Sequence, residues 1–414
     1  MTLTRRGFLD RFLEAGRALP SPDLIHGRGL EALRGEENDW EPQAGGPPGG
    51  RPQGVGGGFQ FSSTPPGPNA VRIDSNENPL GPGKSTMDAL YAEFGQTNRY
   101  PFNSRLKDSD LVTAIAKKCG VKNESVTIGN GSGELLRNAV RAFTTPERGV
   151  VGGNPTYASP GSTATLIGNP VKAIGLTKDL KLDFDAMAEA AKGAGLVFVC
   201  NPNNPTATVQ SAKAISDFVA RVHQSSPDTV ILLDEAYHDY VTDPSHATQI
   251  PLAVSQPNVL VARTMSKAYG MAGLRLGYAI GQADTVARLA RYKMPYNANV
   301  LVVAAAIASL ADQKHIDEER ARNTVARTFT IDFFKKAGYP PTDSQTNFIF
   351  VNLNRTAKEF RDACAKEEIL VGRDFRPLEQ THSRISIGTM EEMRKAVAVF
   401  AKVLGVPATT AARG

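Results

Sequence analysis

From Val71 onward, short apolar runs alternate with segments of helical periodicity. The strand-like runs are residues 126–128, 150–152, 196–200, 230–233 and 259–262. Continuous apolar runs of this length are typical of strands that are buried on both faces of a sheet. Their alternation with helical segments predicts βαβ units. The sequence therefore predicts an α/β fold with a mainly parallel sheet.

Composition narrows the class of protein. The chain has 414 residues, of which 41% are hydrophobic and 21% charged, as in ordinary soluble globular proteins of two or three domains. The formal charge of +5 is mild, and no basic cluster is interleaved with aromatic residues, so we expect no nucleic-acid partner. The three cysteines are far apart in the sequence, which excludes a disulfide framework and predicts no metal site. No apolar run is long enough to span a membrane.

Residues 1–69 differ from the rest of the chain. Residues 45–58 are rich in glycine and proline and predict a flexible linker. Residues 4–9 resemble a twin-arginine export signal, but Asp10 and Arg11 interrupt the place where the apolar segment of such a signal should lie. We expect a cytoplasmic location. Twin-arginine export is the alternative, and an amphipathic helix or a disordered tail would also fit this segment.

Residues 264–277 carry the densest group of chemically useful side chains. Lys267 follows the apolar run 259–262 inside a glycine-rich turn, with Ser266 before it and Arg275 after it. A lysine at the end of a buried strand is costly to desolvate unless it is used, and a Schiff base with a carbonyl cofactor would use it. Ser266 and Arg275 would suit a phosphate group. Taken alone, the same residues also fit an exposed lysine in a loop.

Four other strand ends carry polar or aromatic residues. Gly129-Asn130-Gly131-Ser132-Gly133 leads from a strand into a helix, and the free N–H groups of such a turn bind phosphate well. Tyr157 could cover a flat ring or simply pack, and Asn204 lies in a turn made rigid by two prolines. Asp234 follows directly on a buried apolar strand, so we expect its carboxylate to bind a cation, to form a structural salt bridge or to cap a helix. Since open α/β sheets bind ligands at the carboxyl ends of their strands, we expect these residues and Lys267 to share one site.

With these motifs in place, the sequence resembles the fold-type I (class I/II) aminotransferases, which use pyridoxal 5'-phosphate (PLP). The match covers about residues 70–404. It is most specific in Asn201-Pro-Asn-Asn-Pro-Thr206, Asp234-Glu-Ala-Tyr237 and Ser266-Lys267 with Ala272-Gly-Leu-Arg275. Within this superfamily, residues 76–82 (Asn-Glu-Asn-Pro-Leu-Gly-Pro) are most similar to those of histidinol-phosphate aminotransferases.

The resemblance implies a cofactor-binding role for each matching residue. Lys267 would form the Schiff base and act as general base and acid, and Asp234 would keep the pyridine nitrogen protonated. Asn204 and Tyr237 would hydrogen-bond the phenolic oxygen of the ring. The ring and phosphate would be held by Ser132, Gly133, Tyr157, Thr264, Ser266 and Arg275.

The resemblance also implies substrate and subunit contacts. Arg384 would bind the substrate α-carboxylate, and Arg373, which could also be a surface residue, would be a second arginine of the pocket. Asn76 and Asn347 would complete the substrate site. Tyr100, otherwise an ordinary packing aromatic, would reach the phosphate of a neighbouring subunit. The implied assembly is a homodimer with shared active sites.

The predicted organisation is a large PLP-binding domain at residues 84–298 and a small domain built from residues 70–83 and 299–406. The expected reaction transfers an amino group between an amino acid and a 2-oxo acid, with histidinol phosphate and 2-oxoglutarate as the leading pair. Ala207 and Gly133 depart from the family pattern but remove no catalytic group. The alternatives are another amino-acid substrate, such as an aromatic one, another PLP reaction such as oxidation or decarboxylation, and a non-catalytic binding protein.

Overall fold

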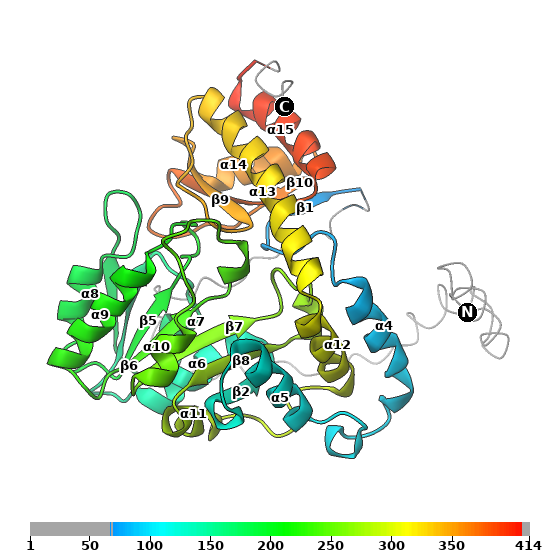
Figure 1. Cartoon of the computed structure of the whole chain (residues 1–414). Helices are drawn as coiled ribbons and strands as arrows, with labels where there is room; N and C mark the ends of the chain where they lie inside the picture. Colours follow the sequence, from blue (N-terminus) through cyan, green and yellow to red (C-terminus); the bar gives the residue numbers. More distant parts are fainter. Residues whose placement is uncertain (1–66, 68, 408–414) are drawn as a thin grey trace, which may run out of the picture. The chain divides into compact units, whose positions relative to one another are not determined.

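The computed structural model describes residue 67 and residues 69–407 (Figure 1). The twin-arginine-like start and the glycine-rich linker lie outside these described residues. The main sheet has seven strands, in the spatial order β2 (Val126–Gly129), β8 (Gly277–Gly281), β7 (Val259–Thr264), β6 (Val230–Asp234), β5 (Leu196–Cys200), β3 (Val150–Asn154) and β4 (Val171–Gly175).

The pairs β3–β4, β3–β5, β5–β6 and β6–β7 are parallel, which confirms the prediction of a mainly parallel sheet. Strand β8 is the exception, because it runs antiparallel to both β7 and β2. Only the turn around Lys267 joins β7 to β8, and a parallel pair would need a longer crossover connection. Strand β2 consequently points the same way as β7.

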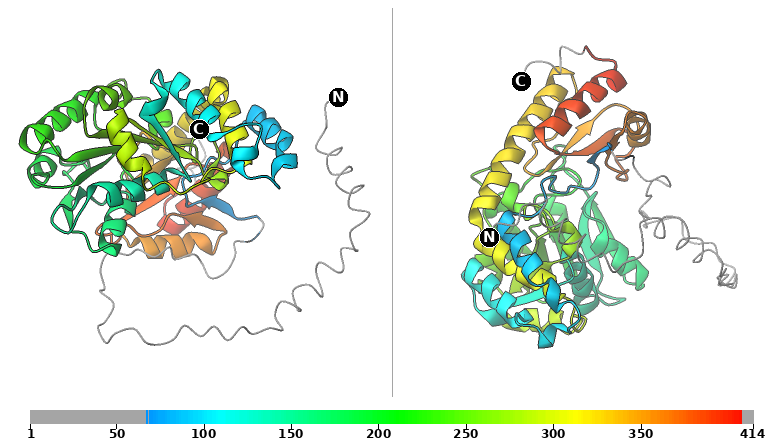
Figure 2. Two further views of the ribbon diagram at one scale, coloured as in Figure 1. Left: turned by 90° about the horizontal axis from the view of Figure 1, so that it is seen from below. Right: turned by 90° about the vertical axis from the view of Figure 1, so that its right-hand side faces the viewer.

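Helices cover both faces of this sheet (Figures 1 and 2). One face packs against α6 (Ser132–Phe143), α7 (Ser159–Leu166) and α11 (Ala283–Ala290). The other packs against α5 (Asp108–Cys119), α8 (Phe184–Ala190), α9 (Ala212–Ser225) and α10 (Ile250–Ser255), with α4 (Lys84–Ala92) and α12 (Val300–Ala311) on the same side. Strand β5 shows why both faces are apolar: Leu196 and Phe198 enter the first layer, whereas Val197 and Val199 enter the second.

The C-terminal elements form a separate apolar core around two small sheets. Strand β1 (Val71–Ile73) pairs in parallel with β10 (Ile369–Val371), and β9 (Phe348–Asn352) pairs antiparallel with β11 (His382–Ser386). Helices α13 (Gln313–Lys336), α14 (Ala357–Ala365) and α15 (Met390–Leu404) pack on these strands. Figure 2 shows β1, in blue, lying among the orange and red C-terminal elements.

Local sequence explains where the last helices begin and end. Thr356 with Glu359 and Thr389 with Glu392 form capping boxes at the starts of α14 and α15, and Gly405 ends α15 in the left-handed conformation. Short 3-10 turns occupy Phe94–Gln96, Pro101–Asn103, Asn123–Ser125, His238–Tyr240 and Ala272–Leu274. Among the described residues, no helix combines the length and the apolar character needed to cross a bilayer.

Candidate active site

The polar strand ends predicted from the sequence meet at one edge of the sheet. Strands β2, β3, β5, β6 and β7 all point toward this edge. Asp234 is the last residue of β6 and pairs with Cys200, the last residue of β5. Thr264 ends β7, and the turn with Lys267 follows directly. The edge therefore brings an amine, a carboxylate and a helix start to neighbouring strand ends.

The start of α6 forms an anion cradle. Gly131, which precedes the helix, has a φ of 70°, and an added Cβ atom would collide with the guanidinium of Arg275. Nη1 of Arg275 lies 3.4 Å from Oγ of Ser266, and the hydroxyl of Thr264 accepts a hydrogen bond from the Ser266 N–H at 3.1 Å. A free helix start, a guanidinium and two hydroxyls match the donors that a phosphate monoester requires.

Asp234 is a buried carboxylate at the end of β6. Its Oδ1 accepts a hydrogen bond from the N–H of Ala236 at 3.2 Å, and no ion pair within the described residues involves it. Burial is the main reason why its pKa is raised from 3.8 to about 7. A buried carboxylate with so high a pKa favours a cationic partner such as a pyridinium nitrogen.

Lys267 is half-buried beside these groups. Its Nζ donates a hydrogen bond to the carbonyl of Ser75 at 3.3 Å and lies 5.8 Å from the centre of the Tyr237 ring. Burial first, and then the charge of Arg384, lowers the pKa of the amine from 10.5 to about 8. A substantial fraction of the amine is therefore neutral near pH 8, as nucleophilic attack on a carbonyl requires.

Tyr237 and Asn204 are in direct contact. Nδ2 of Asn204 donates to the Tyr237 hydroxyl at 3.3 Å, and Oδ1 of Asn204 accepts from Nη1 of Arg384 at 2.9 Å. The second Nη of Arg384 donates to the carbonyl of Asp74 at 2.7 Å. Its Nε is buried and has no hydrogen-bond partner among the described residues. This unused donor leaves Arg384 able to bind an additional anion.

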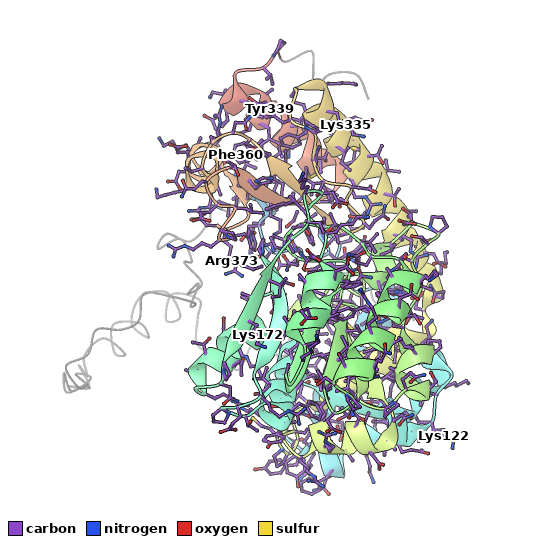
Figure 3. All side chains as sticks on the ribbon, turned by 90° about the vertical axis from the view of Figure 1, so that its left-hand side faces the viewer. Lys122, Lys172, Lys335, Tyr339, Phe360 and Arg373 are labelled. Carbon is purple, nitrogen blue, oxygen red and sulfur yellow. The ribbon has the colours of Figure 1, made fainter. Side chains whose placement is uncertain are left out.

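A second guanidinium lies close to Arg384. The ring of Phe375 is 4.7 Å from the guanidinium of Arg384 and 5.1 Å from that of Arg373. Burial lowers the pKa of Arg384 from 12.5 to about 10, and the positive charge of Arg373 contributes to the shift. Figure 3 shows Arg373 between the C-terminal elements and the elements of the main sheet. Two neighbouring cations of which one is buried favour an anionic ligand.

Tyr157 and Tyr100 lie in different settings. Tyr157 is partly buried near Asp234 and Arg373, since both charges influence its pKa, which burial raises. Tyr100 is 68% exposed and stacks on Phe102 at 5.7 Å, with Tyr296 at 6.1 Å. None of the contacts of Tyr100 within the described residues reaches the strand ends. Its predicted role in a neighbouring subunit stays a prediction.

Asn76 and Asn347, predicted as substrate ligands, are both buried. Asn76 contacts Tyr237 and Ser386 through its side chain, and Nδ2 of Asn347 donates to the Asn76 carbonyl at 3.0 Å. Ser386 was not among the predicted residues. The alternation of β11 could have indicated it, because Ser386 and Arg384 are two residues apart and therefore share one face of the strand.

A buried ion pair that was not predicted from the sequence lies next to Asp234. The carboxylate of Glu235 accepts from Nε of Arg263 at 2.8 Å, from the Thr248 hydroxyl at 2.9 Å and from the Gln249 N–H at 2.6 Å. The signal was present in the sequence: Arg263 interrupts an otherwise apolar strand, and a buried charge requires a partner.

Two histidines lie beside this ion pair. Nδ1 of His238 is 3.0 Å from Nε2 of His246, so one ring donates a hydrogen bond to the other. A cavity of about 340 Å³ lies next to the end of the lysine turn. It is lined by Arg72, Glu77, Asn78, Pro79, Gly270, Ala272, Gly273, Ser386, Ile387, Gly388 and Glu392. Lys267 and Asp234 do not line this cavity, so the reactive groups lie outside it.

The donor set fits PLP. The cradle at α6 suits its phosphate, the carboxylate of Asp234 suits its pyridine nitrogen, and the amine of Lys267 suits its carbonyl carbon. The fold and these strand ends define a PLP-dependent transferase of fold type I. The sequence profile of the family "Aminotransferase class I and II" matches residues 68–400, and the chain belongs to this family.

Two relatives specify the branch. The chain is 35% identical over 326 residues to a histidinol-phosphate aminotransferase from Limosilactobacillus fermentum. The match covers 78% of this chain and 88% of the relative. The structure of histidinol-phosphate aminotransferase from Sinorhizobium meliloti in complex with pyridoxal-5'-phosphate superposes with a TM-score of 0.74 at 28% identity, covering 81% and 91% of the two chains. The protein is thus a PLP-dependent aminotransferase similar to histidinol-phosphate aminotransferases.

A third similarity shows the fold alone. L-threonine-O-3-phosphate decarboxylase from Porphyromonas gingivalis superposes with a TM-score of 0.68 at 21% identity, and the match covers 81% of this chain and 99% of that one.

Proposed function

We propose that the protein transfers the amino group of histidinol phosphate to 2-oxoglutarate. The observation that carries this proposal is the pair of guanidiniums at Phe375. Histidinol phosphate has a phosphate monoester where an amino acid has its α-carboxylate, and 2-oxoglutarate has two carboxylates. Both substrates need a site rich in positive charge, and Arg384 with Arg373 supplies it. The similarity to histidinol-phosphate aminotransferases supports the same pair of substrates.

When bound, PLP supplies a carbonyl carbon that captures amines and a pyridinium ring that withdraws electrons from the substrate Cα. Lys267 then moves a proton at its Nζ, and its lowered pKa suits both release and capture. The buried carboxylate of Asp234 would keep the pyridine nitrogen protonated, and the Tyr237 hydroxyl would donate a hydrogen bond to the ring oxygen. The phosphate would be held by Ser132, Gly133, Thr264, Ser266 and Arg275, and Tyr157 would cover the ring.

Substrate recognition falls to the C-terminal elements in this proposal. Arg384 binds the carboxylate of 2-oxoglutarate or the phosphate of histidinol phosphate, using the Nε that has no described partner. Arg373 binds the second carboxylate of 2-oxoglutarate. The side-chain amide of Asn347 orients the segment at Asn76 by donating a hydrogen bond to the Asn76 carbonyl.

The proposed assembly is a homodimer. Tyr100, Phe102 and Tyr296 form an exposed aromatic cluster, and exposed apolar patches of this kind mark interaction sites. We also propose the domain division at residues 84–298 and at 70–83 with 299–406. It is supported by the apolar core that Val71 and Ile73 share with the C-terminal helices. Within the second part, α12 differs from the C-terminal elements because it packs in the layer on the main sheet. The cytoplasmic location stays a prediction.

The test is a single half-reaction followed by visible absorbance. PLP-loaded protein is mixed first with histidinol phosphate and then, separately, with a panel of amino acids that includes aromatic ones. We expect rapid conversion to the amine form of the cofactor with histidinol phosphate and with glutamate. Conversion by other amino acids but not by histidinol phosphate would reject this substrate. Bound cofactor without any conversion would favour oxidation or decarboxylation.

A further inference from the structure

The hydroxyl oxygen of Tyr237 accepts two hydrogen bonds from side-chain amides. Nδ2 of Asn76 donates to it at 3.0 Å and Nδ2 of Asn204 at 3.3 Å. The two amide N–H groups occupy the acceptor positions of this phenolic oxygen. Its own hydrogen must therefore point away from both amides. Among the described residues no acceptor takes that hydrogen.

We propose that Asn76 and Ser386 are positioning residues that fix the direction of the Tyr237 hydroxyl hydrogen, so that it faces the ring oxygen of the cofactor. This inference rests on the proposed function, because it assigns the hydrogen to bound PLP. It also changes the expected role of Asn76 from substrate ligand to a residue that acts through Tyr237.

Ser386 determines which end of the Asn76 amide faces Tyr237. Its Oγ accepts a hydrogen bond from the Asn76 N–H at 2.9 Å and donates to Oδ1 of Asn76 at 2.7 Å. Since Oδ1 is held by this hydroxyl, Nδ2 is the end that reaches the phenol. Both polar atoms of the Asn76 side chain are therefore engaged inside the protein.

The backbone at Asn76 is held in an unusual conformation. Its φ is 55°, a left-handed value that asparagine tolerates better than most residues, and the residue is 1% exposed. Asn347 binds its carbonyl from the other side at 3.0 Å. Such a buried, left-handed residue persists only where its surroundings determine it, and it places the amide against Tyr237.

Tyr237 acts as a donor because it remains protonated. Burial raises the pKa of Tyr237 above the ordinary value. The ring of Phe348 makes an edge contact with Tyr237, 5.0 Å between ring centres, and provides an apolar environment on that side. A neutral phenol whose acceptor positions are filled has one remaining interaction to offer. That interaction is a donated hydrogen bond toward the strand ends.

The test uses Asn76→Asp, which has nearly the same shape and also tolerates the left-handed conformation. An ionised carboxylate accepts hydrogen bonds and donates none, so the Tyr237 hydroxyl would turn toward it and away from the cofactor. A donor to the ring oxygen stabilises the form of the cofactor in which that oxygen is negatively charged. Its loss should raise the pH midpoint of the visible absorbance change of the PLP-loaded protein by about one unit.

Ser386→Ala is the second variant, because it releases Oδ1 of Asn76 without placing a charge, and a smaller shift in the same direction is expected. Each variant has a matched control. Asn169→Asp changes a buried asparagine whose Nδ2 donates to the Thr144 hydroxyl at 2.7 Å, far along the chain from Tyr237. Ser383→Ala changes another buried serine of β11, and the Oγ of Ser383 has no hydrogen-bond partner among the described residues.

Shifted midpoints in both variants with unchanged controls would support the assignment. Unchanged midpoints in PLP-loaded Asn76→Asp and Ser386→Ala would overturn it, and Ser386→Ala alone decides if Asn76→Asp does not fold. A wild-type protein that binds no PLP would instead contradict the proposed function. The readout is a spectroscopic titration, so it does not depend on turnover.

Discussion

The guanidinium of Arg275 occupies the space that a Cβ atom at Gly131 would fill. The two residues come from different strand ends, and the contact closes the anion cradle at the start of α6. Gly131 is therefore required both for its φ of 70° and for the close approach of the arginine.

Gly131→Ala should weaken PLP binding by at least about tenfold, because the methyl group displaces Arg275 and strains the turn by roughly 1 kcal/mol or more. The dissociation constant is measured by titrating apoprotein with PLP. Gly133→Ala is the matched control. Its Cβ would meet no atom within 4 Å, and the N–H expected to bind phosphate is kept. Equal affinities for the two variants would contradict the cradle.

Lys267→Ala should lower turnover by at least about a thousandfold, since the covalent link and the proton carrier are lost together. Borohydride reduction followed by mass spectrometry should find PLP attached to the wild-type protein but not to the variant. Lys172→Ala is the control, because it removes an exposed lysine that donates a hydrogen bond to the Ala190 carbonyl. Turnover and PLP attachment should both be unchanged in this variant. Retained turnover in Lys267→Ala would refute the assignment.

Arg384→Ala should lower kcat/KM for every substrate by roughly a hundredfold, mainly through KM, because the carboxylate or phosphate it binds is common to all of them. Steady-state kinetics with glutamate and histidinol phosphate check this. The control is Arg288→Ala on α11, because the guanidinium of Arg288 lies 4.7 Å from the ring of Phe143 at the end of α6, a similar stacking away from the site. An unchanged KM in Arg384→Ala would remove this role.

Asp234→Asn should stabilise the apoprotein while weakening PLP binding. Because burial raises the pKa of Asp234 to about 7, the folded protein holds a proton that the unfolded chain has released between about pH 4 and 7. The free energy of unfolding therefore falls as the pH rises through this range, by up to about 4 kcal/mol. Denaturant unfolding of the apoproteins should show the variant more stable at pH 8 and similar to wild type near pH 4. A less stable variant at pH 8 would contradict this.

His238 should make the protein sensitive to acid. Burial first, then the charges of Arg263, His246 and Arg320, lowers the pKa of His238 from 6.5 to about 2, so the unfolded chain binds a proton that the folded protein does not. Stability is complete above pH 6.5 and falls by about 1 kcal/mol between pH 6.5 and 5.5. His238→Gln should reduce this fall, as measured by denaturant unfolding at several pH values. An identical pH dependence would show that other groups determine acid stability.

The residues that could be predicted from the sequence are those whose neighbours along the chain reveal their setting. Lys267 and Asp234 each follow an apolar run directly, and the rule that ligands bind at the carboxyl edge of a parallel sheet then groups them. The fold class followed from the same alternation of runs. Strand β8 was not predicted as antiparallel, because an apolar run carries no information on direction.

Contacts between distant parts of the chain could not be predicted in this way. Asn76 and Ser386 are 310 residues apart, and nothing in either local sequence indicates the other. Arg263 and Glu235 are a different case, since a charge within an apolar strand indicates that a partner exists without saying which. Tyr296, an aromatic neighbour of Tyr100, is likewise distant from it in the sequence, so this contact could not be predicted.

The pairing of β1 with β10 has a consequence for synthesis of the chain. Val71 pairs with Ile369, so β1 leaves the ribosome nearly 300 residues before its partner exists. At about 5–20 residues per second, that interval lasts roughly 15–60 s. During this time the seven-stranded sheet can already form, whereas Asn76, three residues beyond β1, waits for the C-terminal elements. The nascent protein would thus gain its cofactor cradle well before it gains the means to orient Tyr237.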